Sequence, residues 1–228
     1  QPRVKPSHKW GETPPRFNGE SPTHLSRHNQ DILYFGSNKF HRSLKKGDEM
    51  ETLSGDLTNG GRKGNVSYGT LTCINESPLR FGLLYTGSDD GAIHVSKDGG
   101  YNWENISRKL PQHLWVSTVV ASNHAENRVY TSLNGYRWDD FTPYLYVPED
   151  NGKKWDRLGT NLPKEAINVV KEDPKNPDLL YVGTDHGLYI SLDRGKTFMQ
   201  MRNGMPAVAV HDVVVHPRDN DLVVGTHG

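Results

Sequence analysis

The sequence predicts an all-β protein, a β-propeller built from four-stranded blades, and two observations carry this prediction. The first is a strand pattern that recurs five times, at Leu33–Ser37, Leu84–Ser88, Val129–Ser132, Leu180–Thr184 and Leu222–Thr226. The second positions of these strands are residues 34, 85, 130, 181 and 223, so the steps are 51, 45, 51 and 42 residues. The second observation is a short turn of the form SxDxGxTW. Repeats of about 40 to 50 residues, each with several short strands, are typical of propeller blades.

The turn, called the box below, has two good copies, Ser96–Trp103 and Ser191–Phe198. A third, Pro148–Trp155, lacks the leading hydroxyl, and a fourth, beginning at Ser43, has Lys45 where the aspartate belongs. We expect the Ser and Asp side chains to bind backbone amides of the turn, the Gly to take a positive φ, and the aromatic residue to pack between sheets. The box aspartates are therefore expected to be structural: Asp98, Asp150 and Asp193.

Each repeat contains four predicted strands, which in the last complete copy are Ile167–Lys171, Leu179–Thr184, Gly187–Ser191 and Thr197–Met201. The predicted blades are 21–58, 68–111, 115–163 and 166–206, followed by a half blade at 208–228, or about four and a half blades in all. Residues 1–20, rich in Pro and charge, are expected to be an extended N-terminal segment or linker. Because a partial ring exposes strand edges, we expect the remainder of the propeller to come from the same parent or from another chain. No segment has apolar residues spaced at the 3.6-residue period of an amphipathic helix, so almost no helix is expected.

Composition disfavours several classes of partner. The chain has 27 basic and 27 acidic residues, so it lacks the net positive charge that nucleic-acid binding usually requires. No apolar run approaches the roughly 20 residues of a membrane helix, and no direct membrane insertion is expected. Cys73 is the single cysteine, which excludes an internal disulfide, and its alternating surroundings favour a core position. Histidines and acids are dispersed, so neither a metal site nor a cofactor is predicted.

Alternating strand directions divide the loops between two faces. The turns between the first and second strands of each blade lie on one face, together with the boxes. The loops between the second and third strands lie on the opposite face, together with the connections between blades. On this second face the insertion 134–144 supplies aromatic rings and bonding groups within a few residues, as a sugar site requires. The alternative is that these aromatics pack the loop onto the next blade, with Trp138 buried. The candidate ligand-binding residues are Trp115, Tyr136, Arg137, Trp138, Asp139, Asp140, Tyr144 and His186.

Catalysis stays an open question. Glycoside hydrolysis needs two carboxyl groups about 5 to 10 Å apart, and neighbours on an extended chain point apart, so a pair would have to form between blades. The candidate catalytic residues are Asp89, Asp90, Asp139, Asp140 and Asp185. A sialidase would need an arginine cluster with a Tyr and Glu pair, and this face offers only Arg137 with Tyr136.

Three features together suggest a family: the boxes at 96–103 and 191–198, the turn Asp173–Asp178 that leads into Leu180–Thr184, and the insertion around Trp138. In them the chain resembles the Asp-box (BNR) repeat superfamily, specifically the sortilin/VPS10-like propellers of large secreted bacterial proteins labelled glycosyl hydrolases. The resemblance covers nearly all of residues 21–228. It implies a longer bacterial parent at the cell surface, outside the cell or in the periplasm. It also implies a polysaccharide or peptide ligand.

Three functions are consistent with this resemblance, and the box alone does not choose among them. The first is a module that recognises a glycan or peptide. The second is a glycoside hydrolase whose carboxylate pair lies in a cleft shared with another propeller, as in the xyloglucanase-like enzymes of the superfamily. The third is a non-catalytic structural or adhesion propeller.

Overall fold

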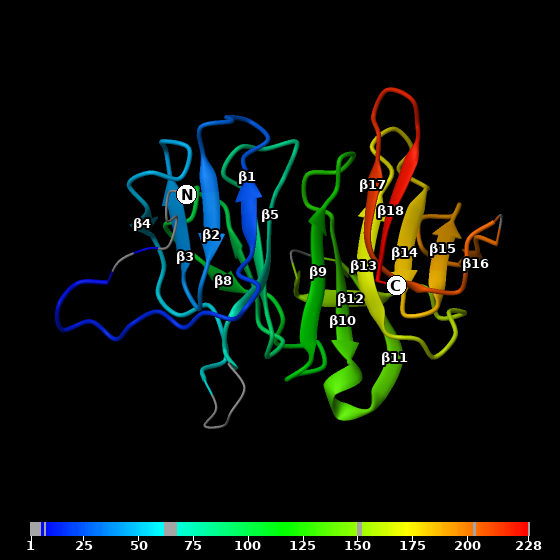
Figure 1. The fold of residues 1–228 in the computed structure, drawn as a ribbon, viewed down its shortest axis with the longest axis horizontal. Coiled ribbons are helices and arrows are strands. Elements are labelled where there is room, and N and C mark those ends of the chain that lie inside the picture. The colour runs from blue at the N-terminus through cyan, green and yellow to red at the C-terminus, as the bar shows by residue number, and fades with distance from the viewer. Residues whose placement is uncertain (1–5, 7, 62–67, 150–151, 203, 228) are drawn as a thin grey trace. The chain divides into compact units, whose positions relative to one another are not determined.

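The structure is a computed structural model that describes residues 6, 8–61, 68–149, 152–202 and 204–227. It is a β-propeller fold, as predicted: four antiparallel four-stranded sheets and one two-stranded sheet follow one another along the chain (Figure 1). Within the described residues, the one helical element is a short 3-10 turn, η1 (Tyr136–Trp138). The chain divides into two compact units, Gln1–Val116 and Ser117–Gly228. No helix among the described residues is long and apolar enough to cross a membrane.

The first unit contains two blades. The first blade comprises β1 (Thr23–Leu25), β2 (Leu33–Gly36), β3 (Phe40–Ser43) and β4 (Glu51–Thr52). The second blade comprises β5 (Leu71–Glu76), β6 (Leu84–Ser88), β7 (Ile93–Ser96) and β8 (Glu104–Asn105). An apolar cluster lies between the two sheets, with Tyr34 and Phe40 on one side and Leu71, Ile74 and Leu84 on the other.

The second unit contains two blades and the two-stranded sheet. The third blade comprises β9 (Trp115–Ala121, which begins in the first unit), β10 (Val129–Gly135), β11 (Asp140–Glu149) and β12 (Lys154–Arg157). The fourth comprises β13 (Ile167–Glu172), β14 (Leu180–Thr184), β15 (Gly187–Ser191) and β16 (Met199–Gln200). The last sheet pairs β17 (Ala209–Val215) with β18 (Leu222–His227). Their order and sequence match the first and second strands of the other blades.

The box at residues 96–103 is held by the bonds that its sequence predicts. The Ser96 hydroxyl accepts from the Gly100 amide at 2.9 Å, and Asp98 accepts from the Asn102 amide at 2.9 Å. Ser191 and Asp193 do the same for the Gly195 and Thr197 amides, at 2.8 and 2.9 Å. The degenerate copy keeps one bond, from the Gly47 amide to Ser43 at 2.9 Å. The third predicted copy, with Asp150, lies in part outside the described residues.

Boxes and first-to-second-strand turns lie together, as the alternation of strands predicts. The Gly99 amide donates to the Gly82 carbonyl at 2.9 Å, and the Arg194 amide donates to the Asp178 carbonyl at 2.8 Å. The second-to-third loops therefore occupy the other end of each sheet, where the candidate ligand-binding residues of the insertion lie.

Buried glutamates join neighbouring blades within each unit. Glu76, at the end of β5, accepts from the Ser26 hydroxyl at 2.6 Å and from the Tyr34 hydroxyl at 2.8 Å. Burial and the Glu76 carboxylate raise the pKa of Tyr34, which therefore stays a neutral donor. Glu172, at the end of β13, accepts from the Ser122 hydroxyl at 2.7 Å. Both glutamate residues are almost fully buried, so each carboxylate depends on these donors.

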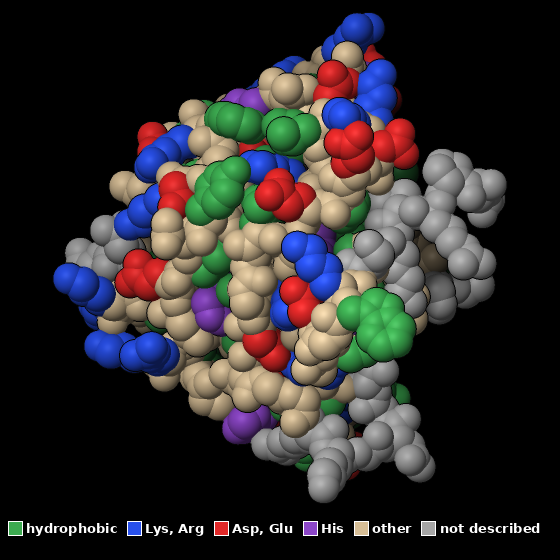
Figure 2. Space-filling view, turned by 90° about the vertical axis from the view of Figure 1, so that its left-hand side faces the viewer, with side chains coloured by type: hydrophobic (Ala, Val, Ile, Leu, Met, Phe, Trp, Pro, Cys, Tyr) green, Lys and Arg blue, Asp and Glu red, His purple; other side chains and the backbone are tan. Residues whose placement is uncertain are grey.

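Cys73, for which a core position was predicted, is only half-buried on β5; its sulfur lies over Gly87 of β6, where an added Cβ would approach it to 2.7 Å. In the N-terminal segment, Arg16 donates a hydrogen bond to the Gly69 carbonyl at 3.1 Å and forms an ion pair with Asp56 at 2.5 Å. On the face seen in Figure 2, acidic and basic side chains are interspersed.

Candidate ligand-binding site

The insertion predicted as a loop is largely a long hairpin of β10 and β11. Leu133 pairs with Tyr144, and Gly135 pairs with Asp140 across the hairpin. The 3-10 turn η1 closes its end, and Asp139 leaves that turn in the left-handed region at φ 54°. A residue of this type tolerates that conformation because its short side chain is compatible with it. The residues that the sequence placed on one long loop are therefore held on a paired hairpin.

Three apolar rings stand exposed at the end of this hairpin. Tyr136 is 62% exposed, Trp138 54% and Phe141 41%, and we call these three residues the aromatic tip. Tyr136 and Phe141 make an edge-to-face contact with centroids 6.1 Å apart. The alternative in which Trp138 is buried against the next blade does not match this exposure. Arg137 and Asp139, in the same turn, are also exposed.

Asp140 and Tyr144 form a hydrogen-bonded pair next to the aromatic tip in sequence. The Tyr144 hydroxyl donates to Asp140 at 2.7 Å, and the Thr142 amide donates to the same carboxylate at 3.0 Å. Burial opposes ionisation, but the bonds from Thr142 and Tyr144 outweigh it and hold the pKa of Asp140 below its ordinary value. Asp140 is therefore an ionised acceptor, suited to a hydroxyl group and not to giving up a proton as a general acid.

A row of three polar side chains connects β10 to the loop after β14. The side-chain amide of Asn134 donates a hydrogen bond to the Oδ1 atom of Asn168 at 3.1 Å, and the side-chain amide of Asn168 donates one to the Asp185 carboxylate at 2.9 Å. All three are half-buried, and we call them the polar row. Asp185 was predicted as a candidate, whereas Asn134 and Asn168 were not named, because a single amide in a strand carries no motif. The exposed His186 follows Asp185 in the loop.

Asn168 lies at a β-bulge, a feature that the strand pairing shows and the sequence alone does not. Bulges interrupt β5, β13 and β17 at the equivalent place, leaving Thr72, Asn168 and His211 as the extra residues. Thr72 donates its hydroxyl to the Val116 carbonyl at 2.6 Å and thus bonds the next strand in its unit. Asn168 instead bonds Asn134 and Asp185. Bulges are common beside functional sites because they redirect a side chain.

Glu165 is a further acid that sequence reasoning missed. It precedes β13 and accepts from the Thr184 hydroxyl at 2.7 Å and from the Tyr189 hydroxyl at 3.1 Å. Burial and the contact with Glu165 raise the pKa of Tyr189 to about 12. Tyr189 is thus a neutral donor, and Glu165 secures the end of β14, where the Asp185 loop begins.

The other predicted acids lie in the first unit and hold loops. Asp89 is 3% exposed and accepts from the Gly69 and Thr70 amides at 2.8 and 3.0 Å. Asp90 is fully buried, accepts from the Asn59 amide at 2.8 Å and from the Ser88 hydroxyl, and has a pKa raised by burial. Trp115, half-buried at the start of β9, also belongs to the first unit.

The structure therefore brings together part of the predicted set. Within the second unit, one hairpin carries Tyr136, Arg137, Trp138, Asp139, Asp140 and Tyr144. Asp185 and His186 follow β14 in the same unit, and the polar row connects Asp185 to this hairpin through Asn134. Across the part of the chain that the structure describes, no group of three His, Cys, Asp or Glu residues could hold a metal ion.

Known structures support the fold. The chain is similar to the GH74 xyloglucanase of Xanthomonas campestris, at 19% identity and a TM-score of 0.60 over 82% of this chain and 30% of that one. It is similar to YCF48 bound to D1 peptide, at 13% identity and 0.59 over 96% of this chain and 64% of that one. It is also similar to the extracellular domain of a one-component system from B. thetaiotaomicron, at 13% identity and 0.63 over 96% and 27%. The chain spans less than a third of the xyloglucanase and of that extracellular domain. No family model and no curated protein matches the sequence.

Proposed function

We propose that this protein is a propeller module that recognises a glycan through the aromatic tip and the polar groups around it. The observation that carries the proposal is the exposure of Tyr136, Trp138 and Phe141 on a paired hairpin. Three exposed rings within six residues cost hydration free energy unless a ligand covers them. Pyranose rings present apolar faces that pack against aromatic side chains, while their hydroxyl groups point outward to polar partners.

The polar groups near the tip suit a neutral sugar. Asp140 and Asp185 are acceptors, Arg137 is a donor, and the Asn134 and Asn168 amides fix the position of the Asp185 carboxylate. Charge-assisted hydrogen bonds from such groups to hydroxyls are stronger than neutral ones and also fix the direction of the ligand. The scaffold of β10 and β11 holds the rings before the ligand arrives, which reduces the entropy lost on binding.

Hydrolysis is the less favoured reading for this chain. The carboxylate oxygens of Asp89 and Asp90 already accept hydrogen bonds from backbone amides and from the Thr70 and Ser88 hydroxyls, and Asp140 lacks the raised pKa of a general acid. The similarity to a xyloglucanase concerns about a third of that enzyme and supports the fold rather than its activity. We further propose a larger bacterial parent exported to the cell surface, outside the cell or to the periplasm, in which other strands complete the propeller.

Binding of oligosaccharides tests the proposal. Neutral gluco-, manno- and xylo-oligosaccharides are titrated into the protein by calorimetry, and the best is retitrated into Trp138→Ala and Tyr136→Ala. We expect each variant to lose about tenfold in affinity, or about 1.4 kcal/mol. Tyr101→Ala is the matched control, because Tyr101 is 58% exposed in the first unit and Tyr136 is 62% exposed.

The competing functions predict other results. Retained affinity in Trp138→Ala, or loss in Tyr101→Ala as large as in Tyr136→Ala, would contradict a site at the tip. Binding of peptides but of no sugar would favour a peptide module, the activity named for the similar YCF48. Release of reducing ends from the oligosaccharides would establish the hydrolase, and no ligand of either class would favour a structural propeller.

A further inference from the structure

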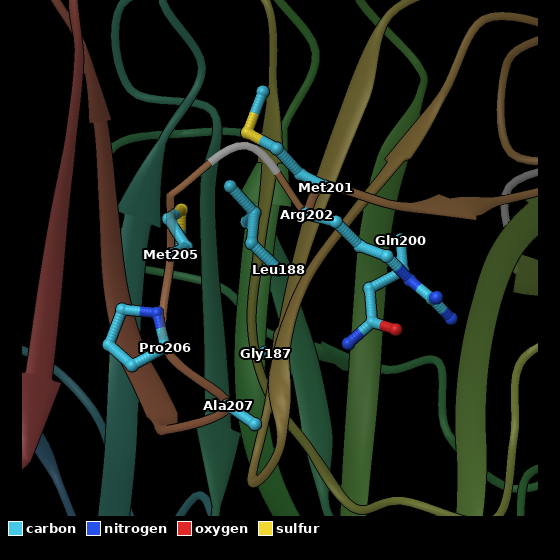
Figure 3. Close-up of a pocket in the computed structure, with 8 residues that line it drawn as sticks. All are labelled: Gly187, Leu188, Gln200, Met201, Arg202, Met205, Pro206 and Ala207. Carbon is cyan, nitrogen blue, oxygen red and sulfur yellow. The ribbon is translucent and has the colours of Figure 1, made fainter.

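The second unit contains an apolar pocket of about 320 Å³ that is distinct from the aromatic tip. It is lined by Gly187, Leu188, Gln200, Met201, Arg202, Met205, Pro206 and Ala207. Figure 3 shows Leu188 between the side chains of Met201 and Met205, with Gln200 and Arg202 on the side away from Met205. A cavity of about 150 Å³ is already large enough for a benzene ring.

Three of these residues occupy positions that recur in other blades. The Met201 amide donates to the Leu188 carbonyl, as the Leu53 amide does to Phe40 and the Leu158 amide does to Leu145. A third residue follows four positions later in each case: Leu57, Leu162 and Met205. We call each set of three a socket. The sockets are Phe40, Leu53 and Leu57 in the first blade, Leu145, Leu158 and Leu162 in the third, and Leu188, Met201 and Met205 in the fourth.

The first and third sockets are filled, and in both the occupant is the aromatic residue that ends the next blade's box. Trp103 packs on Phe40 with ring centroids 5.0 Å apart and belongs to the same apolar cluster as Leu53 and Leu57. Phe198 belongs to the cluster of Leu145, Leu158 and Leu162. The glycine of each box approaches the same place: a Cβ on Gly100 would lie 2.6 Å from Phe40, and one on Gly195 would lie 2.9 Å from Leu158.

Among the described residues, the fourth socket has its inner neighbours but no aromatic residue of a box beside it; the aromatic ring in its cluster is Tyr181, from the second strand of the same blade. Its cluster contains Val210 and Val213 from β17 and Leu222 from β18. These correspond to Leu71, Ile74 and Leu84 of the first unit. Leu84 and Leu180 are 0% exposed under their boxes, whereas Leu222 is only half-buried and Val223 is 60% exposed. The cluster therefore lacks the cover that the other two have.

We propose that the fourth socket is a docking site for a box hairpin, meaning two antiparallel strands joined by an SxDxGxx-aromatic turn. The first strand pairs with the open edge of β18, and the aromatic side chain enters between Leu188, Met201 and Met205. This rests on the proposed completion of the propeller by other strands, and it is independent of the sugar site. Burial of the ring and pairing of β18 are both favourable terms for docking.

A peptide with the sequence of Gly187–Met201 of this chain tests the docking, because it contains one strand, a box and a second strand. Labelled peptide is titrated with the full 228-residue protein by fluorescence anisotropy. We expect saturable binding and a higher Tm of the protein at saturating peptide. Phe198→Ala in the peptide should weaken binding at least tenfold, whereas Leu192→Ala, at a box position that is 62% exposed, should not.

A substitution in the socket of the protein tests where the aromatic ring of the peptide binds. Met205→Ala in the protein should weaken binding of the parent peptide and leave binding of the Phe198→Ala peptide unchanged, because only the aromatic ring contacts Met205. Binding that ignores both changes would overturn the socket while leaving strand addition at β18, and thus completion of the propeller, intact. A second form of the test appends residues 187–206 after Gly228 and compares Tm with an Ala at the copied Phe198. Equal Tm values for the two fusions, together with no peptide binding, would overturn the proposal. Self-association of the protein that the peptide does not displace would also overturn it, in favour of a second copy as occupant.

Discussion

At the scale of single residues, one amide distinguishes the fourth blade from the others. Thr72 and Ser117 donate their hydroxyls to the carbonyls of Val116 and Ile167, at 2.6 and 2.8 Å. Asn168, in the corresponding place of β13, bonds Asn134 and Asp185 instead. A hydroxyl at this position donates to a backbone carbonyl of the next blade, whereas the longer side-chain amide of Asn168 reaches Asp185 in the loop after β14. The change of residue type therefore converts a structural bond into support for a candidate binding group.

Asn168→Ser tests this positioning role. The shorter hydroxyl cannot bridge Asn134 and Asp185, so we expect a severalfold lower oligosaccharide affinity with Tm nearly unchanged. Calorimetry and thermal unfolding measure the two effects. An equal loss from Thr72→Ala, which lies in the first unit, would mean that the effect is a general one on strand stability. Restored affinity in Asn168→Gln would support positioning by the amide.

The box aspartates predict a specific acid sensitivity. Bonds from the Asn102 side chain and amide lower the pKa of Asp98 to about 2, and bonds from Thr197 do the same for Asp193. Since both pKa values lie below the ordinary 3.8, the ionised form favours the folded state, and its contribution is lost as pH falls from about 4 to about 2. The double variant Asp98→Asn, Asp193→Asn should have a lower Tm than the parent at pH 6 and the same Tm near pH 2. Parallel Tm curves from pH 6 to 2 would contradict this origin.

At the scale of elements, the ends of β5 and β13 are joined to the preceding blade by buried carboxylates. Glu76→Ala leaves the Ser26 and Tyr34 hydroxyls without their acceptor in a buried site. Each hydrogen bond to a charged group contributes about 1.5–3 kcal/mol, and a buried unpaired donor adds to the loss. We expect a large fall in the urea midpoint, and a smaller one in Glu76→Gln. Glu104→Ala, at an exposed strand glutamate, is the control and should change little. Equal midpoints for the variants at residues 76 and 104 would show that the buried bonds carry no net stability.

At the scale of the whole molecule, the repeat is a pair of blades as well as a single blade. Ser26 and Ser122 lie 96 residues apart in the sequence, as do Glu76 and Glu172. The intervening blade ends have Leu25, Ala121 and Val215 where these glutamates stand. Within each compact unit, the serine that follows the first strand of one blade therefore donates a hydrogen bond to the glutamate that ends the first strand of the next blade. In each unit this buried carboxylate hydrogen bond joins its two four-stranded blades.

The sequence by itself determined the blades, the boxes and the face on which each loop lies. These features depend on local bonds, between Ser96 or Asp98 and the amides of their own turn, and on strand alternation, so neighbours in sequence suffice to predict them. The tertiary structure alone decided that Trp138 is exposed, that Asp89 and Asp90 are buried under loop amides, and that Leu188 lines an open socket. Burial and polar partnership at these positions are set by side chains tens of residues away, such as Asn59 beside Asp90, and no local pattern encodes such contacts.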